Sequence, residues 1–208
     1  MWALVLDTSS DQGIAGLFAD GKKLFDVALP TGYRHSTYLV GQVREGLRSV
    51  GITPHDLSYI AVGTGPGSYT GLRVAASIAK TLSYAAGVPL VSVCSLLAWA
   101  PAEAILIDAR VSGVYGWRGG APCVVAIAEL PQWLEGVSTV VSPHPSLIQK
   151  RVALSSAYTW LERAPALEAL ASAAEEEFRQ GKATRGDHLP LIYLSQTQTE
   201  RHLPVLHC

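Results

Sequence analysis

Charged side chains are scarce in this sequence of 208 residues, since Asp, Glu, Lys and Arg make up 16% and apolar residues 49%. So few charges are unusual for a soluble monomer, and we expect part of the apolar surface to face a partner protein. The charges also balance, with 16 basic and 17 acidic residues. Without excess positive charge the chain lacks the field that attracts nucleic acid, so we expect only indirect contact with it.

Cysteine and targeting signals are also scarce. Cys94, Cys123 and Cys208 share no C-x-x-C spacing, which predicts neither a disulfide framework nor a zinc site and favours a reduced, cytoplasmic setting. The apolar start of the chain meets Asp7 too soon for a signal peptide. Residues 81–102 are uncharged and about long enough to span a membrane, but Gly-Val-Pro interrupts them, so we predict no membrane span.

A glycine-rich stretch over residues 63–74 does not match the well-known glycine motifs. A P-loop needs Lys after its last glycine, where Leu72 stands. The dinucleotide fingerprint fails because Thr70 replaces its third glycine. The nucleophile elbow fails because Pro and Thr flank Ser68 where glycines belong. Two interpretations stay open, a tight structural turn and a phosphate contact.

A buried strand and a helix flank this stretch. Residues 59–62 are β-branched and apolar, which predicts a strand. Residues 72–86 predict a helix that ends near Gly87 and that Ser68 or Thr70 could cap. Apart from Arg73 and Lys80, this helix is apolar or small on every side. We therefore expect its own sheet to cover one face and a second lobe or a second protein to cover the others.

The rest of the chain reads as two similar halves. In the first we predict strands 2–6, 13–19, 22–29, 59–62 and 89–93, with helices 36–50, 72–86 and 96–100. In the second we predict strands 104–107, 114–117, 123–128, 137–141 and 191–194, a helical turn 131–134, a loop or short helix from 143, and a helix 164–180. Each half begins with a strand that ends in Asp and is followed by two more strands, which indicates a weak internal duplication.

Two polar features invite a functional interpretation. The turn Asp7-Thr8-Ser9 could hold a phosphate or position a metal, although a turn that caps its own backbone is the commoner use of these residues. His35 stands at the start of the 36–50 helix without a second ligand at metal spacing. We therefore interpret His35 as a cap or a surface group.

The glycine-rich stretch, Gly-Thr-Gly-Pro-Gly-Ser-Tyr-Thr-Gly-Leu-Arg, resembles the signature of the bacterial TsaB (YeaZ) family, subunits of the tRNA threonylcarbamoyladenosine machinery. Residues 4–10, 34–37 and 107–115 resemble the family's other landmarks in the same order, and the match covers about residues 2–118. The resemblance implies an α/β actin-like ATPase (ASKHA) fold of two lobes, each starting with three meandering strands in a mixed sheet flanked by helices. It implies an N-terminal lobe over 1–103, which carries the dimerisation helices, and a shortened C-terminal lobe over 104–208.

The resemblance also implies a protein without catalytic activity. The family's catalytic relative TsaD carries a His-x-x-x-His metal motif whose positions fall on Ser95 and Trp99 here. We therefore expect no metal and no cofactor, leaving weak nucleotide binding open. The implied function is to bind and activate a TsaD-type transferase. Implied partners are this transferase and a TsaE-like ATPase, with a homodimer in the absence of the transferase and tRNA contacted only indirectly.

Three sets of residues carry these expectations. The signature loop comprises Gly63, Gly65, Pro66, Gly67, Ser68, Tyr69, Thr70 and Gly71. A vestigial nucleotide cleft would comprise Asp7, Thr8, Ser9, Asp108 and Arg110. The partner interface would comprise Leu39, Val40, Val43, Leu47, Leu72, Arg73, Ala76 and Lys80.

Two rival functions remain. A small-molecule kinase of the same superfamily would use Asp7 and Asp108 as its carboxylates. A peptidase ranks lower, because the sequence shows no Ser/His/Asp or paired-His pattern.

Overall fold

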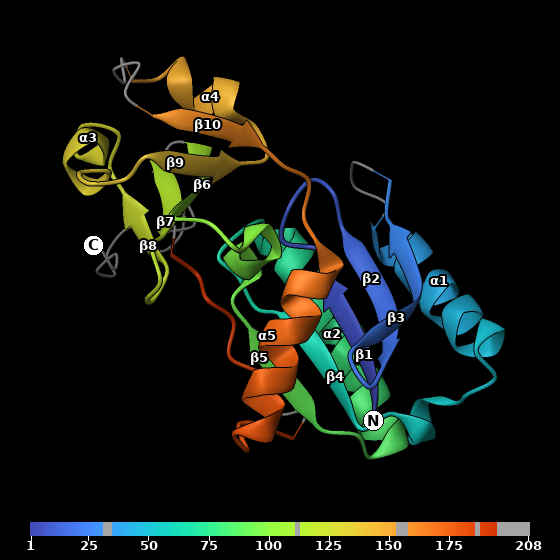
Figure 1. Ribbon diagram of the computed structural model, residues 1–208. Coiled ribbons are helices and arrows are strands. Elements are labelled where there is room, and N and C mark those ends of the chain that lie inside the picture. The colour runs from blue at the N-terminus through green and yellow to red at the C-terminus, as the bar shows by residue number, and fades with distance from the viewer. Residues whose placement is uncertain (31–34, 111–112, 153–157, 186–187, 195–208) are drawn as a thin grey trace. The chain divides into compact units, whose positions relative to one another are not determined.

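The computed structural model describes residues 1–30, 35–110, 113–152, 158–185 and 188–194 (Figure 1). Its contacts divide the chain into two units, one of residues 1–98 with 166–192 and one of residues 99–165 with the chain from 193 onward. The expected boundary between 103 and 104 stays a prediction. In the structure, the helix after residue 166 packs on the sheet of the first unit.

The first unit is built on a five-stranded mixed sheet in the order β3-β2-β1-β4-β5. Its strands are β1 (Trp2–Asp7), β2 (Ile14–Ala19), β3 (Lys22–Ala28), β4 (Tyr59–Gly63) and β5 (Leu90–Val93). The first three form an antiparallel meander, while β4 pairs in parallel with both β1 and β5. Strands β1 and β4 are almost wholly buried, because a central strand with both faces covered needs apolar side chains on each side.

Helices cover both faces of this sheet (Figure 1). Helices α1 (His35–Ser49) and α2 (Tyr69–Ala86) contact each other and lie on one face, where Leu4, Leu6 and Ile60 point into a shared core. Helix α5 (Leu167–Arg179) packs on the other face and contacts β5 most closely. Successive side chains of each strand therefore point to opposite faces of the sheet, one covered by α1 and α2 and the other by α5.

The second unit contains a second five-stranded sheet, in the order β10-β9-β6-β7-β8. Its strands are β6 (Ala104–Asp108), β7 (Val114–Trp117), β8 (Cys123–Val125), β9 (Thr139–Ser142) and β10 (Thr159–Glu162). Strands β6, β7 and β8 repeat the antiparallel meander of the first unit, and β9 pairs in parallel with β6. The short helices α3 (Leu130–Trp133) and α4 (Pro145–Gln149) belong to this unit, and residues of both lie in its core. The predicted duplication in topology is thus present.

Several elements differ from the prediction. Residues 191–194 form no strand, since Ile192 makes a single backbone hydrogen bond, from its N–H to the Thr64 carbonyl at 2.7 Å. Strand β10 was missed because three of its four side chains are exposed, which removes the alternating pattern. The expected helix at 96–100 is a 3-10 helix, η2 (Ser95–Trp99), and a further one, η1 (Pro54–Asp56), precedes β4.

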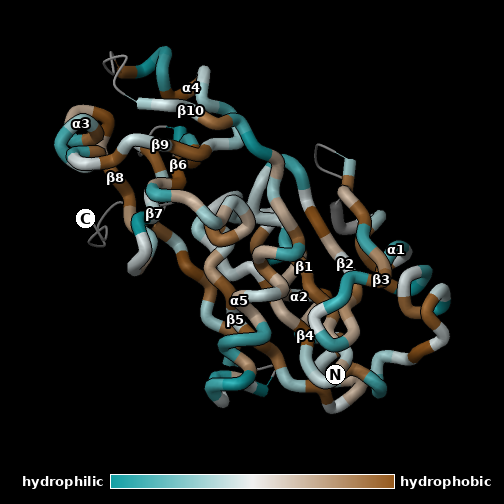
Figure 2. The backbone as a smooth tube through the Cα atoms, viewed as in Figure 1, coloured by the Kyte–Doolittle hydropathy of each residue, from teal (hydrophilic) through white to brown (hydrophobic). Residues whose placement is uncertain are grey.

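Hydropathy follows this architecture. In Figure 2 the hydrophobic residues concentrate in the strands, whereas the C-terminal half of α5, with its three consecutive glutamates, is hydrophilic. Two glutamates of this run form ion pairs, Glu175 with Arg179 and Glu177 with Lys182. Within the described part of the chain, every helix is too short or too polar to cross a membrane.

Candidate functional site

The glycine-rich loop lies where three parallel strands end. Asp7 is the last residue of β1, Gly63 the last of β4 and Val93 the last of β5. The carboxyl edge of such strands is the usual ligand-binding edge of an α/β sheet. The structure therefore brings together two motifs that are more than 50 residues apart in the sequence, the Asp7-Thr8-Ser9 turn and the signature loop.

Three glycines of the loop are required because the Asp7-Thr8-Ser9 turn packs directly against them. An added Cβ would lie 1.8 Å from Asp7 Oδ2 at Gly63, 2.4 Å from the Ser9 carbonyl oxygen at Gly67, and 1.8 Å from the Thr8 carbonyl oxygen at Gly71. No side chain fits at such distances. The Thr8 hydroxyl also donates a hydrogen bond of 2.6 Å to the Gly71 carbonyl, so the turn and the loop form one packed unit.

Four N–H groups of the loop donate to oxygen atoms of the chain itself. They join Thr64 to the Val93 carbonyl at 2.8 Å, Gly65 to Ser95 Oγ at 3.0 Å, Ser68 to the Ser9 carbonyl at 2.7 Å, and Gly71 to Ser68 Oγ at 3.3 Å. These groups are not available to a phosphate. Of the two interpretations that the sequence left open, these hydrogen bonds favour the tight structural turn, and a phosphate contact stays a prediction.

Helix α2 begins at Tyr69, three residues earlier than expected, because Ser68 is its N-cap. Thr70, the other candidate cap, lies inside the helix. The helix ends at Gly87, whose φ of 70° is left-handed and suits glycine. The signature loop thus fixes where α2 starts.

The Asp7 carboxyl group is buried, with 4% of the residue exposed. Its Oδ1 accepts a hydrogen bond of 2.6 Å from the Ser9 N–H, while Oδ2 has no hydrogen-bond partner in the described chain. Burial raises the pKa of Asp7, and hydrogen bonding to Ser9 opposes this in part. Burial thus makes the charged form of Asp7 less favourable, which does not suit a metal ligand.

Burial also acts on a thiol next to this cluster. Burial raises the pKa of Cys94 to about 11, and the nearby Asp7 carboxylate adds to the shift. Cys94 is a free cysteine, whereas Cys123 is disulfide-bonded. The expectation that the cysteines form no disulfide is therefore wrong for Cys123.

The corresponding turn of the second unit is held by an arginine. Asp108, at the end of β6, forms an ion pair with Arg151, whose guanidinium also donates to the Gly113 carbonyl at 3.1 Å. Arg110 is exposed. The nucleotide cleft that would join this turn to the Asp7 turn stays a prediction.

The two positions that correspond to the metal-binding histidines carry buried side chains with structural contacts. Ser95 Oγ accepts the Gly65 N–H, and the Ser95 N–H donates to the Gly65 carbonyl at 2.8 Å. The Trp99 indole donates to the Arg163 carbonyl at 2.8 Å. Neither a hydroxyl nor an indole replaces an imidazole pair. Among the described residues, no three His, Cys, Asp or Glu side chains are grouped so as to hold a metal.

The structure corrects most of the expected partner interface. Five of the eight side chains are buried within the first unit: Leu39, Val43, Leu47 and Ala76 in the core shared with the sheet, and Leu72 next to Gly65 of the signature loop. Buried side chains cannot offer a surface to another protein. The stripe of apolar residues looks the same whether the sheet or a partner covers it, which is why the sequence misled us. Val40, Arg73 and Lys80 remain at least partly exposed.

The exposed sides of α1 and α2 carry aromatic residues that the sequence analysis did not select. Tyr84 is 92% exposed and Val40 55%, while Tyr38 and Tyr69 are each exposed as well. The Arg73 guanidinium lies 4.0 Å from the centre of the Tyr69 ring. We call Tyr38, Val40, Tyr69, Arg73, Lys80 and Tyr84 the outer face of α1 and α2. The row 73, 77, 80, 84, which is turned about 100° around the helix from the buried row 72, 76, 79, 83, could have identified its α2 part.

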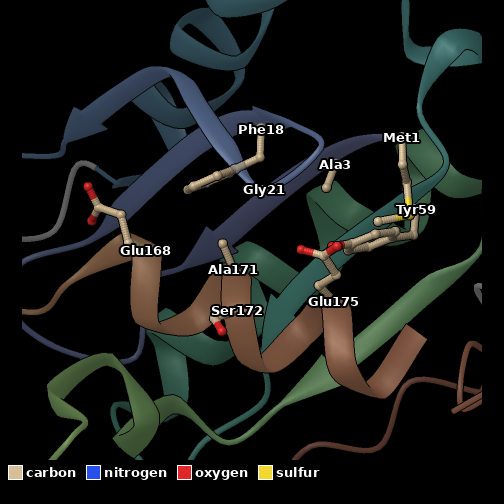
Figure 3. Close-up of a pocket in the computed structure, with 9 residues that line it drawn as sticks. All are labelled: Met1, Ala3, Phe18, Gly21, Tyr59, Glu168, Ala171, Ser172 and Glu175. Carbon is tan, nitrogen blue, oxygen red and sulfur yellow. The ribbon is translucent and has the colours of Figure 1, made fainter. Parts of the chain in front are cut away.

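A small cavity of about 130 Å³ lies between the sheet and α5 in the first unit. In Figure 3, Phe18 and Ala3 of the sheet lie across from Ala171 of α5, and Glu175 lies beside the Tyr59 ring. The charged groups around it are already paired, Met1 with Asp20, Glu168 with Lys23 and Glu175 with Arg179. We therefore interpret the cavity as a packing gap.

Comparison with known proteins places this architecture in a family. A family model described as "TsaD: tRNA N6-adenosine threonylcarbamoyltransferase" matches residues 31–127. The tRNA threonylcarbamoyladenosine biosynthesis protein TsaB of Haemophilus influenzae is 32% identical over 70% of this chain and 66% of its own length. TsaB of Bacillus subtilis is 34% identical over 58% of this chain and 52% of its own length. TsaB of Escherichia coli is 27% identical over 98% of this chain and 99% of its own length.

Solved structures agree with this fold. YeaZ from Pseudomonas aeruginosa superposes with a TM-score of 0.73 at 23% identity, over 93% of this chain and 99% of that one. The expected actin-like ATPase fold is thereby confirmed. The chain belongs to the TsaB (YeaZ) family. The matched segments span less than two thirds of the first two relatives' own length, at 66% and 52%.

Proposed function

We propose that this chain is a non-catalytic subunit that binds and activates a TsaD-type transferase during formation of threonylcarbamoyladenosine in tRNA. The outer face of α1 and α2 is the observation that carries the proposal. Tyrosine and arginine are the residues most enriched at binding hot spots, and Tyr84 is almost fully exposed. Helix α2 has basic residues and no acidic one, so this face suits a partner that presents apolar groups beside carboxylates.

The family match supports a transferase as the occupant of this face. The transferase family model matches residues 31–127, a range that includes all of α1 and α2. A partner built on the same helix pair can dock by a pseudo-twofold arrangement, in which equivalent surfaces meet. By the same reasoning a second copy of this chain could occupy the face when the transferase is absent.

Three features support the absence of catalytic activity. Ser95 and Trp99 occupy the positions of the expected histidine pair. Four N–H groups of the glycine-rich loop are used by the chain itself. Burial raises the pKa of Asp7, so its charged form is less favourable than that of an exposed carboxyl group. The transferase would then supply the reacting groups, and this chain would supply a docking surface.

The rival kinase function is less well supported. It requires ionised carboxylates that hold a metal and activate a hydroxyl. Asp7 has a raised pKa and Asp108 is paired with Arg151. The balance of 16 basic and 17 acidic residues also supports indirect contact with tRNA. A TsaE-like ATPase as third member remains part of the proposal.

Reconstituted tRNA modification tests the proposed function. The assay contains the cognate TsaD-type transferase, the other pathway proteins, ATP, threonine, bicarbonate and tRNA, with and without this chain. We expect modification to depend on the chain, while the chain alone hydrolyses no ATP. Full modification without the chain would refute the proposal. Phosphate transfer from ATP to a small hydroxyl compound by the isolated chain would favour the kinase.

A further inference from the structure

The segment that follows α5 returns along the edge of the first sheet. Thr184 exchanges two backbone hydrogen bonds of 2.8 Å with Leu90, at the start of the edge strand β5. Residues 188–192, which we call the strap, then reach the other end of that edge. There the Ile192 N–H donates to the Thr64 carbonyl at 2.7 Å. Figure 1 shows this segment in red beside β5.

The strap contacts the signature loop closely. A Cβ added to Gly65 would lie 2.6 Å from the Ile192 carbonyl oxygen, so the loop backbone and the strap backbone are packed against each other. The strap is anchored by Leu189, which is buried in the core beneath α1 and α2, and by Leu191, which is partly buried against that core. Backbone pairing and apolar burial therefore act together to hold it.

We propose that the strap is a positioning element that holds the signature loop and the first turns of α2 in the conformation that docks the partner. The inference rests on the proposed function. Residues 64–68 lead directly into α2, and Ser68 is its N-cap, so any displacement of the loop moves Tyr69 and Arg73 on the outer face. The other described hydrogen bonds of the loop go to Thr8, Ser9, Val93 and Ser95, all of which are buried.

The strap is the attachment that opens most easily. Among the described contacts, one backbone hydrogen bond joins the strap to the loop, and Leu189 is its buried leucine side chain. Elements with few buried contacts open with low free energies, well below that of global unfolding. Release of the strap would therefore loosen the docking face without unfolding the sheet, which makes the strap a point at which partner affinity can be tuned.

A pair of substitutions at Ile192 tests this inference in the full chain. Ile192→Pro removes the N–H that donates to Thr64, whereas Ile192→Ala keeps it and serves as the control. We expect Ile192→Pro to raise amide hydrogen exchange in residues 64–72 about tenfold over Ile192→Ala. We also expect it to weaken binding of the TsaD-type transferase by about fivefold in titration calorimetry.

A second pair of substitutions tests the same inference in case the Ile192→Pro variant misfolds. Leu189→Ala loosens the strap away from the loop, while Leu57→Ala removes an equally buried leucine from the same core but not from the strap. We expect only Leu189→Ala to raise exchange in residues 64–72. Equal exchange in the two variants of each pair would overturn the inference, and so would raised exchange with unchanged affinity. If the wild-type chain does not bind the transferase, the proposed function fails, while the exchange data still decide whether the strap holds the loop.

Discussion

Replacement of Tyr84 by aspartate separates docking from folding. The Tyr84 side chain is 92% exposed at the last turn of α2 and lies on the outer face. An exposed substitution of this kind changes the free energy of unfolding by no more than about 0.5 kcal/mol. If Tyr84 anchors the partner, its loss and the new charge cost at least about 2 kcal/mol of binding free energy, as at other hot spots. That corresponds to roughly a 30-fold higher Kd.

The buried face of the same helix should respond in the opposite way. Leu72 is fully buried inside the first unit. An aspartate there would place an unpaired charge in an apolar core, at a cost of several kcal/mol. We therefore expect Leu72→Asp to unfold the chain, whereas Tyr84→Asp leaves it folded and unable to dock.

The measurement combines calorimetric titration of the transferase with urea unfolding of each variant. Tyr84→Phe keeps the ring and should bind like the wild type. Leu147→Asp introduces the same charge at an exposed apolar residue of the second unit and should also bind normally. Unchanged affinity in Tyr84→Asp, or an equal loss in Leu147→Asp, would refute the assignment of the docking face to α1 and α2.

Two further predictions concern the glycine-rich cluster. Gly71→Ala should lower the free energy of unfolding by about 1–3 kcal/mol, because its Cβ would lie 1.8 Å from the Thr8 carbonyl oxygen. The control Gly41→Ala, at an open position of α1, should instead raise the free energy of unfolding by about 0.5–1 kcal/mol. Equal effects of the two substitutions in thermal melts would contradict the packing argument. Asp7 has a pKa raised above its ordinary 3.8 by burial, so it stabilises the fold fully below 3.8 and progressively less as the pH rises through its folded-state pKa. Urea unfolding across this range should show the wild type losing stability relative to Asp7→Asn as the pH rises, and a constant difference would contradict a buried, proton-binding Asp7.

The sequence by itself determined the elements and the family. The strand at 59–62, the helix that follows and the repeat of strands ending in Asp7 and Asp108 are all present. They could be recognised because hydrophobic period, glycine and proline punctuation and capping residues are local signals. Pairing of the meanders in both halves also followed from short connections and turn residues.

Only the tertiary structure decided what each apolar side chain faces. Leu39 and Ala76 belong to the chain's own core, whereas Val40 and Tyr84 are left outside it. A stripe of apolar residues along a helix indicates that the stripe is buried. It does not indicate whether a sheet of the same chain or another protein buries it.

The role of the glycine-rich loop was likewise decided in three dimensions. Gly63 and Gly71 are small because the Asp7-Thr8-Ser9 turn, distant in sequence, approaches within contact distance of them. The strap was invisible in the sequence, since it depends on one backbone hydrogen bond between Ile192 and Thr64. Such pairings between distant segments use backbone groups that nearly all residues have, so no pattern of side chains predicts them.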